Sequence, residues 1–300
     1  SPFNLINDAA YQAWRERKLA SQPNGLDDVS VAIADPLSPG DAEISAIRRI
    51  VGRTNWVLIR VTDPAALDEE ALKGLAAQLG MTRLDKNLCA EDSGVTALTV
   101  KEQTGTPYIP YTSRPLSWHT DGYYNAADEQ IRGWVLYCRQ DAAEGGDNSI
   151  MDHEILYILM RDRDPAMIAA LMAEDAMTIP ANRENGNEIR PDHTGPVFSV
   201  DEAGNLHMRY SARKRNIIWK HNAATHAAVA FIDTLFSDPD APIFHHRLNP
   251  GEGIISNNVL HRREGFRDDA VKGKKRLFFR ARYYDRIAGT DTQQWEASGT

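Results

Sequence analysis

Cysteine is scarce in this sequence, and long apolar runs are absent from it. The 300 residues contain two cysteines, Cys89 and Cys138, so no disulfide framework is expected. No apolar run approaches the ~20 residues that a membrane-spanning helix needs, and the first residues show no signal-peptide pattern. Basic residues are outnumbered, 34 against 42 acidic, which argues against a nucleic-acid partner. These absences predict a soluble, cytoplasmic protein that binds neither membranes nor nucleic acids.

The composition is otherwise that of a folded domain, with 42% hydrophobic and 25% charged residues. Charge is unevenly spread along the chain. The stretch from His261 to Arg282 holds nine lysines and arginines against three acids. This stretch is a candidate for binding a small anion, and a solvated basic strand is the alternative.

Residues 1–90 have the pattern of an α/β cap. Helical spacing of apolar residues covers 8–20, 41–52 and 63–80, and a short buried strand is expected from Asn55. From 91 to 300 the pattern changes to short β-like runs separated by Gly, Pro, Asn and Asp, with helical insertions. No repeat or linker is visible. The sequence therefore predicts one α+β domain over 1–300, with an antiparallel barrel or jelly-roll core.

The stretch "LSWHTDGYY" places His119 and Asp121 two residues apart. On a strand these side chains share a face and can reach one metal ion. His261, at the end of the apolar run in "GEGIISNNVLHRREGF", is the candidate for a third ligand, with Gly251 and Gly253 marking a turn that enters the strand. Two histidines and one carboxylate leave about three octahedral positions open, as in non-haem Fe(II) oxygenases.

Arg276 and Arg280 in "KKRLFFRARYY" follow His261 and share a strand face. A guanidinium fork binds a carboxylate through two hydrogen bonds. If 2-oxoglutarate chelates the iron at one end, its distal carboxylate needs such a partner, and Arg276 is placed to provide it.

Four segments, "WHTD", "EGGDNSIMD", "NNVLHRREGF" and "RLFFR", occur in an order and spacing that resemble the taurine/2,4-D dioxygenase (TauD/TfdA) family. The form His-x-Arg-x-x-Phe at His261, Arg263 and Phe266 is similar to the γ-butyrobetaine hydroxylase and clavaminate synthase branches. The resemblance covers most of the chain, because "LDEEALKGLAAQLG" also looks like the family's amino-terminal helix.

The resemblance implies a double-stranded β-helix (jelly roll) with an α/β cap and helical insertions. It implies His119, Asp121 and His261 as iron ligands and Arg276 as the 2-oxoglutarate anchor. It also implies that Asn148 helps to hold 2-oxoglutarate and that Arg280 lies close to an anionic group; which arginine is the main anchor stays open. The cofactors would be Fe(II), 2-oxoglutarate and O2. Hydroxylation of a small polar or anionic molecule is expected, with release of succinate and CO2, and a homo-oligomer is plausible.

The substrate is not predictable from the sequence, and each candidate contact has a packing alternative. These candidates are Tyr123, Tyr124, Arg209, Arg213 and Arg263. Two other classes of protein compete with the oxygenase. One is a catalytically silent cupin-like barrel that binds a metal or an organic acid, and the other is a metal-dependent hydrolase.

Overall fold

Helices and two principal sheets make up the described part of the chain, which in this computed structural model comprises residues 1–85, 94–100, 109–184, 187–213 and 217–293. Cys89 lies outside these residues. The α-helices are α1 (Asp8–Ala20), α2 (Asp41–Thr54), α3 (Glu69–Gln78), α4 (His153–Arg163), α5 (Pro165–Leu171) and α6 (Ala223–Leu235). Short 3-10 helices are η1 (Leu26–Val29), η2 (Ile109–Tyr111) and η3 (Ala127–Glu129).

The larger sheet has six strands, and one of its two central strands, β16 (Glu252–Ser256), comes from the C-terminal part of the chain. Its order is β1 (Ser30–Ile33), β2 (Trp56–Val61), β16 (Glu252–Ser256), β5 (Gly133–Gln140), β19 (Leu277–Tyr283) and β3 (Thr96–Leu98). β1 and β2 are parallel, and the other neighbours are antiparallel. All residues of β16 are buried, as expected for a strand with neighbours on both edges and both faces covered.

The smaller sheet has four antiparallel strands in the order β15 (Phe244–His246), β7 (Asn148–Met151), β17 (Leu260–Arg263) and β4 (Leu116–His119). Side chains of the two sheets meet. The rings of Trp134 and His261 are 4.7 Å apart, and those of Trp56 and Phe244 are 5.2 Å apart. The two sheets therefore pack face to face around β5, β16 and β17.

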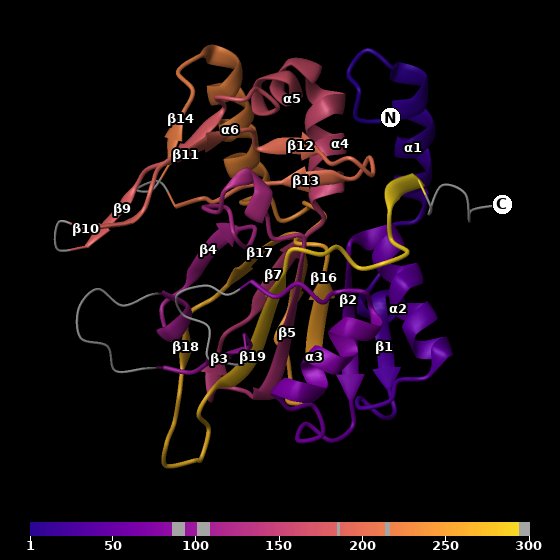
Figure 1. Cartoon of the computed structure of the whole chain (residues 1–300), viewed down its shortest axis with the longest axis vertical. Coiled ribbons are helices and arrows are strands. Elements are labelled where there is room, and N and C mark those ends of the chain that lie inside the picture. Colours follow the sequence, from indigo (N-terminus) through magenta and orange to yellow (C-terminus); the bar gives the residue numbers. More distant parts are fainter. Residues whose placement is uncertain (86–93, 101–108, 185–186, 214–216, 294–300) are drawn as a thin grey trace.

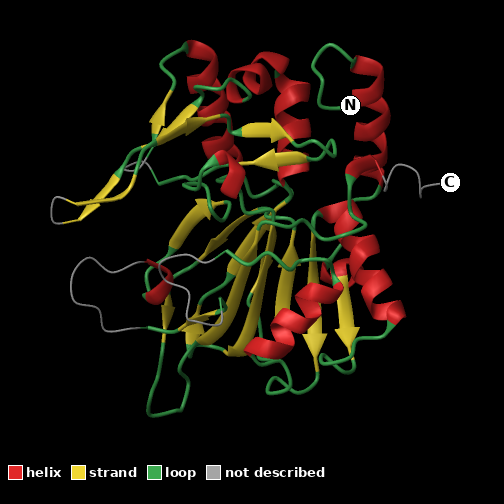
Figure 2. Cartoon of the chain, viewed as in Figure 1, coloured by secondary structure: helices red, strands yellow, loops and turns green. Residues whose placement is uncertain are grey.

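Short ladders and helices form a second layer above the sheets in Figure 1. They comprise β8 (Met177–Ile179), β11 (His193–Gly195) and β14 (Ile218–Trp219) in one sheet, and the pairs β12 (Phe198–Val200) with β13 (Leu206–Met208) and β9 (Asn182–Glu184) with β10 (Asn187–Arg190). A further pair, β6 (Glu144–Gly145) with β18 (Phe266–Arg267), lies lower, where β18 is labelled beside β3 in Figure 1. Figure 2 shows α1, α4, α5 and α6 grouped at this end, while α2 and α3 lie beside the larger sheet.

The N-terminal helices agree largely with the sequence pattern. Helices predicted at 8–20 and 41–52 are confirmed as α1 and α2. The third helix begins at Glu69 rather than near 63, because the carboxylate of Asp68 accepts the backbone N–H of Ala71 at 2.9 Å and so caps the helix there. β1, which pairs with β2, was not predicted.

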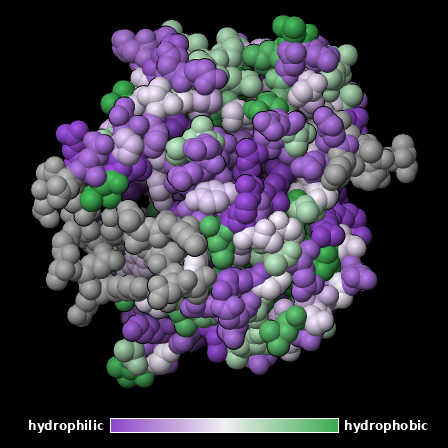
Figure 3. All heavy atoms as spheres, viewed as in Figure 1, coloured by the Kyte–Doolittle hydropathy of each residue, from purple (hydrophilic) through white to green (hydrophobic). Residues whose placement is uncertain are grey.

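Two apolar clusters stabilise these layers. One joins α2 and α3 to the larger sheet, and the other joins α1, α4, α5 and α6 to the short ladders. On the face seen in Figure 3, apolar residues are scattered among polar ones. No helix within the described ranges combines the length and apolar character needed to cross a membrane.

The apolar run that ends at His261 is not one strand, as the sequence suggested, but two. β16 lies in the larger sheet and β17 in the smaller one. Between them, Asn258 has the left-handed φ of 58°, which asparagine tolerates better than most residues. The turn moves the chain from one sheet to the other and brings His261 into the space between them.

Candidate active site

His119, Asp121 and His261 converge, although more than 130 residues separate the second from the third. One ligand atom from each lies within 4.8 Å of the others. His119 and His261 are direct partners across β4 and β17, with ring centroids 4.2 Å apart. The Nε2 atom of His119 is 3.5 Å from Oδ1 of Asp121. Strand register thus brings the two predicted histidines together, and Asp121 completes the set from the residues that follow β4.

Asp121 reaches this point by a different route from the one predicted. β4 ends at His119, so Asp121 lies in the turn that follows and not on the strand face. Gly122 makes that turn with a φ of 66°, and a Cβ there would lie 2.4 Å from Cγ1 of Ile131. A left-handed, tightly packed glycine is therefore required directly after the carboxylate.

The two histidines present the same nitrogen to the centre. Nδ1 of His119 lies 2.8 Å from the carbonyl oxygen of Ser117, and Nδ1 of His261 lies 3.0 Å from that of Val259. A carbonyl only accepts, so Nδ1 carries the proton in both rings and Nε2 keeps its lone pair. Such backbone partners fix the tautomer that metal-binding histidines require.

Electrostatics also favours the metal-binding protonation states. Burial alone would raise the pKa of Asp121, but Arg280, His119, Arg282 and His261 hold it well below its usual range. Burial and the neighbouring His119 lower the pKa of His261 to about 3, so its ring is neutral. Within the described residues, the buried Oδ2 of Asp121 has no hydrogen-bond partner. An anionic oxygen without a donor suits a divalent cation.

Arg276 is 2% exposed, and among the described residues its guanidinium forms no ion pair, because the nearby carboxylate of Asp268 accepts the Arg276 backbone N–H at 2.9 Å instead. The group lies 3.8 Å from the ring centre of Phe278 and 5.0 Å from that of Phe266. Burial, with a contribution from Arg263, lowers the pKa of Arg276 to about 9. A buried cation that rests on aromatic rings and forms no ion pair suits an incoming carboxylate.

Arg276 lies directly before β19, whereas Arg280 and Arg282 lie on that strand, and both of these lower the pKa of Asp121. Nη1 of Arg280 is 3.8 Å from Oδ1 of Asp121. Arg282 pairs with Asp85 and donates to the phenol oxygen of Tyr124 at 2.9 Å. The arginines therefore form a row that starts away from the triad and ends beside it.

Three other arginines were predicted as substrate contacts. Two of them donate to backbone oxygens, and the guanidinium of the third has no described partner. Arg209 donates to the carbonyls of Met177, His193, Gly195 and Pro196. Arg263 donates to those of Thr112 and Arg114. Arg213 follows β13, and its backbone N–H donates to Ser211. The contacts of Arg209 and Arg263 are those of residues that hold loops in place.

Asn148 and the two tyrosines lie close to the centre. Asn148 is buried on β7, which neighbours the histidine-bearing β17. The ring of Tyr123 is 6.5 Å from that of His119 and 5.2 Å from that of Tyr124. The tyrosines therefore extend from the triad toward Arg282.

Sequence reasoning missed three residues that shape this site. Asp85 accepts hydrogen bonds from Arg282 and from Tyr284. Arg190 lies 5.9 Å from the ring centre of Tyr124. Asn258 binds the backbone of Asp121. The adjacent asparagines in "SNNVLH" were a visible signal for a turn, whereas no local pattern links Asp85 or Arg190 to this site.

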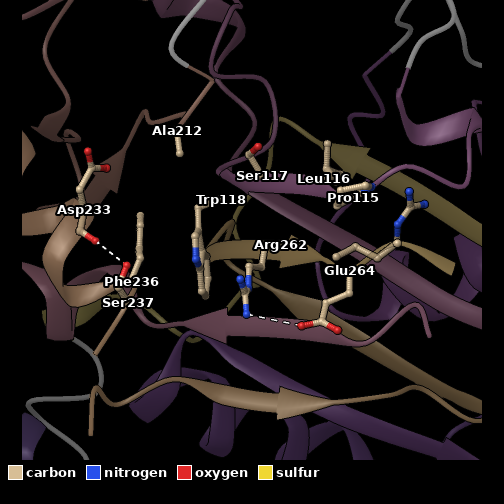
Figure 4. A pocket seen from close by; sticks show the side chains of 12 residues that line it. Pro115, Leu116, Ser117, Trp118, Ala212, Asp233, Phe236, Ser237, Arg262 and Glu264 are labelled. Carbon is tan, nitrogen blue, oxygen red and sulfur yellow. Dashed lines mark hydrogen bonds and ion pairs between the residues drawn. The ribbon is translucent and has the colours of Figure 1, made fainter. Parts of the chain in front are cut away.

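A groove of about 750 Å³ lies on the opposite face of the smaller sheet. Trp118 and Arg262 line it, and each neighbours a triad histidine in sequence, so their side chains point away from the triad. Figure 4 shows Trp118 beside Phe236, with Arg262 paired to Glu264 at 3.7 Å. The groove is therefore separate from the triad.

This arrangement defines a class of protein, the non-haem iron oxygenases: the two imidazoles and the carboxylate would hold the metal and would leave room on it for a keto acid and O2. The sequence model of the taurine catabolism dioxygenase TauD, TfdA family matches residues 17–282. The chain belongs to this family and is an Fe(II)- and 2-oxoglutarate-dependent dioxygenase, rather than a silent barrel or a hydrolase. The predicted family, enzyme class and cofactors are confirmed.

The individual proteins that this chain resembles share only a small part of their sequence with it. A uridine-5'-phosphate dioxygenase from Amycolatopsis sp. is 28% identical over 212 residues, which cover 59% of this chain and 75% of that protein. An asparagine oxygenase structure with Fe(II), 3-hydroxyasparagine and succinate has a TM-score of 0.54 at 18% identity and covers 94% of this chain and 91% of its own. A taurine dioxygenase from Burkholderia xenovorans has a TM-score of 0.54 at 15% identity, with 85% and 87% covered. At these identities the two structures show a shared fold.

Proposed function

We propose that this dioxygenase hydroxylates a small anionic molecule at a centre formed by His119, Asp121 and His261. Fe(II), 2-oxoglutarate and O2 together supply the oxidising chemistry, with release of succinate and CO2. The protein's own groups hold the reactants in place. The observation that carries the proposal is the row formed by Arg276, directly before β19, and by Arg280 and Arg282 on it, in which only Arg282 has a close ion pair with an acid other than Asp121 among the described residues.

The metal assignment is supported by the two Nε2 lone pairs and the carboxylate that face one point. Asp121 also bears on the reaction. Related halogenases have a small residue where this chain has a carboxylate, so the retained Asp121 favours hydroxylation.

We infer that Arg276, rather than Arg280, is the main anchor for the distal carboxylate of 2-oxoglutarate. Arg280 lies beside Asp121, where that ligand would be bound to the metal through its other end. Arg276 lies directly before β19 and is buried, and its guanidinium forms no ion pair among the described residues. Asn148 on β7 is proposed to hold the same ligand, because it lies buried next to the histidine-bearing strand.

Once the proposed ion pairs of the site are formed, the charge that remains around it is positive. In our assignment the charge of Arg276 is neutralised by 2-oxoglutarate, and that of Arg282 by Asp85. Arg280 then has only its 3.8 Å contact with Asp121, the proposed metal ligand. Arg190, near the ring of Tyr124, donates to the carbonyls of Pro180 and Pro191 and forms no ion pair among the described residues. An anionic substrate would supply the missing charge.

Tyr124 is proposed as a substrate contact in the same region. Arg282 donates to its phenol oxygen, which leaves the phenol hydrogen free to donate to an anionic oxygen. Tyr123 lies between Tyr124 and His119 and would line the same space. Uridine-5'-phosphate and asparagine, the compounds in the names of two relatives, both carry an anionic group.

We also infer that the two face-to-face sheets are the halves of a double-stranded β-helix, and that 1–300 acts as one catalytic unit. The small ladders and helices would then be insertions around that barrel. The homo-oligomer and the cytoplasmic location stay predictions.

The test is substrate-stimulated release of succinate in the presence of Fe(II) and O2. Uridine-5'-phosphate, L-asparagine and taurine are compared, with uridine as the neutral control for the phosphate. We expect an anionic compound to raise succinate release about tenfold over the substrate-free rate, and uridine to leave it unchanged. Equal stimulation by uridine and its phosphate would refute the anion proposal. Succinate release that persists in a His119→Ala, Asp121→Ala double variant would refute the metal assignment.

A further inference from the structure

Asn258 makes three hydrogen bonds that hold the backbone around Asp121. Its Oδ1 accepts the backbone N–H of Asp121 at 2.8 Å, and its Nδ2 donates to the carbonyl of the same residue at 3.0 Å. The second hydrogen on Nδ2 reaches the carbonyl of Ile131 at 2.6 Å. The side chain thus pairs with Asp121 as a neighbouring strand would, at a point where β4 has already ended.

We propose that Asn258 is a positioning residue that sets the place of the Asp121 carboxylate relative to His261. It acts through Asp121 and touches neither the metal nor the substrate. His119 and His261 are already held in register by the β4–β17 pair. Asp121 lies beyond that ladder, and Asn258, three residues before His261, connects it to the start of β17.

The backbone of Asn258 shows why this position suits asparagine. Its φ is 58° and the residue is 2% exposed. Glycine or asparagine can adopt this conformation at low cost, but glycine has no side chain to bind Asp121. Asparagine alone among residues that favour this conformation supplies both an acceptor and two donors.

The same three bonds close the loop that carries the tyrosines. Asp121 and Ile131 are its two ends, and the amide of Asn258 contacts both. Gly122 packs against the side chain of Ile131 within this loop. Loss of the Asn258 amide is therefore expected to loosen the carboxylate ligand and the Tyr123 and Tyr124 side of the site together.

Asn257 provides a matched control. It is 3% exposed and also makes three hydrogen bonds, to Asn55, Thr290 and Ile287. These partners are not in the triad or its loop. Removal of either side chain breaks the same number of buried hydrogen bonds, but only one of the two changes touches Asp121.

The experiment is anaerobic titration of the full chain with Mn(II), followed by electron paramagnetic resonance, for Asn258→Gly and Asn257→Gly. Glycine keeps the left-handed backbone at 258. Both variants should unfold at lower temperature than the parent. We expect Asn258→Gly to bind Mn(II) about 10- to 100-fold more weakly, as for other groups that orient metal ligands, and Asn257→Gly to bind it as the parent does. Equal affinities in the two variants would overturn the proposal.

Asn258→Asp is the second variant, for the case that the glycine variant does not fold. It keeps the acceptor for the Asp121 N–H and tolerates the same backbone, but it loses both donors. Its extra negative charge would attract Mn(II), so weaker binding can only come from lost positioning; unchanged or tighter binding would again overturn the proposal.

The inference rests on the proposed assignment of Asp121 as a metal ligand, so Asp121→Ala is titrated in parallel. If that variant binds Mn(II) as the parent does, the metal assignment fails. If Asp121→Ala loses affinity and the Asn258 variants do not, only the positioning role fails.

Discussion

Replacement of Arg276 by methionine should stabilise the ligand-free protein and abolish tight binding of 2-oxoglutarate. The guanidinium is buried and forms no ion pair among the described residues, since the carboxylate of Asp268 binds the backbone N–H of Arg276. Its role is proposed to be binding the distal carboxylate of 2-oxoglutarate. Methionine keeps an apolar contact with the rings of Phe278 and Phe266. The variant thus removes a charge whose burial is uncompensated until the ligand arrives.

The expected size of the stabilisation follows from the burial of Arg276. Lowering its pKa to about 9 corresponds to roughly 5 kcal/mol of unfavourable free energy for the charged form. This is an upper limit, because replacing buried charges with apolar residues elsewhere gains about 1–4 kcal/mol. Each kcal/mol raises the Tm of a chain of this size by about 2 °C. For binding, loss of a buried charge-assisted pair costs about 3 kcal/mol, or about a hundredfold in the Kd of 2-oxoglutarate.

The assay is thermal unfolding with Mn(II), with and without 2-oxoglutarate, and Arg263→Met is the matched control. Arg263 is also buried, and burial lowers its pKa to about 10. Its guanidinium, however, binds the carbonyls of Thr112 and Arg114, so its loss leaves those acceptors unpaired and should lower the Tm. We expect Arg276→Met to raise the Tm and to lose the shift that 2-oxoglutarate causes. A fall in Tm equal to that of Arg263→Met, or a retained 2-oxoglutarate shift, would refute the reasoning.

Two further predictions concern the triad. Gly122→Ala should lower the free energy of unfolding, measured in urea, by about 2–4 kcal/mol, because its Cβ would lie 2.4 Å from Ile131 at a φ of 66°. Gly273→Ala is the control: Gly273 has a φ of 67° but open space around it, so its replacement should lower the same free energy by only about 1 kcal/mol. Equal losses in the two variants would contradict the packing argument. For pH, burial lowers the pKa of His261 to about 3, whereas an unfolded histidine titrates near pH 6.5. Between these values the unfolded chain binds the extra proton, so the metal-free protein should lose stability as the pH falls from about 6.5 toward 3. His261→Gln should flatten this slope in chelator-treated protein, and an unchanged slope would contradict the assignment.

The sequence by itself determined the chemistry of the site and the local elements. Helix periodicity predicted α1 and α2 because their apolar faces repeat along a short stretch of chain. The pattern around His119 and Asp121, with His261 and Arg276 downstream, predicted the iron ligands and the two cofactors, Fe(II) and 2-oxoglutarate. These signals are local residue types in a fixed order, and the sequence contains them directly.

The tertiary structure decided how these residues meet. It moved Asp121 off the strand face into a turn, and it split the run before His261 into β16 and β17, because Asn258 turns the chain left-handedly between two sheets. It also separated Arg280, beside Asp121, from the buried Arg276. Contacts such as that between Asp85 and Arg282 depend on register between segments almost 200 residues apart, which no local pattern encodes. That register is fixed only when the apolar faces of both sheets are buried together.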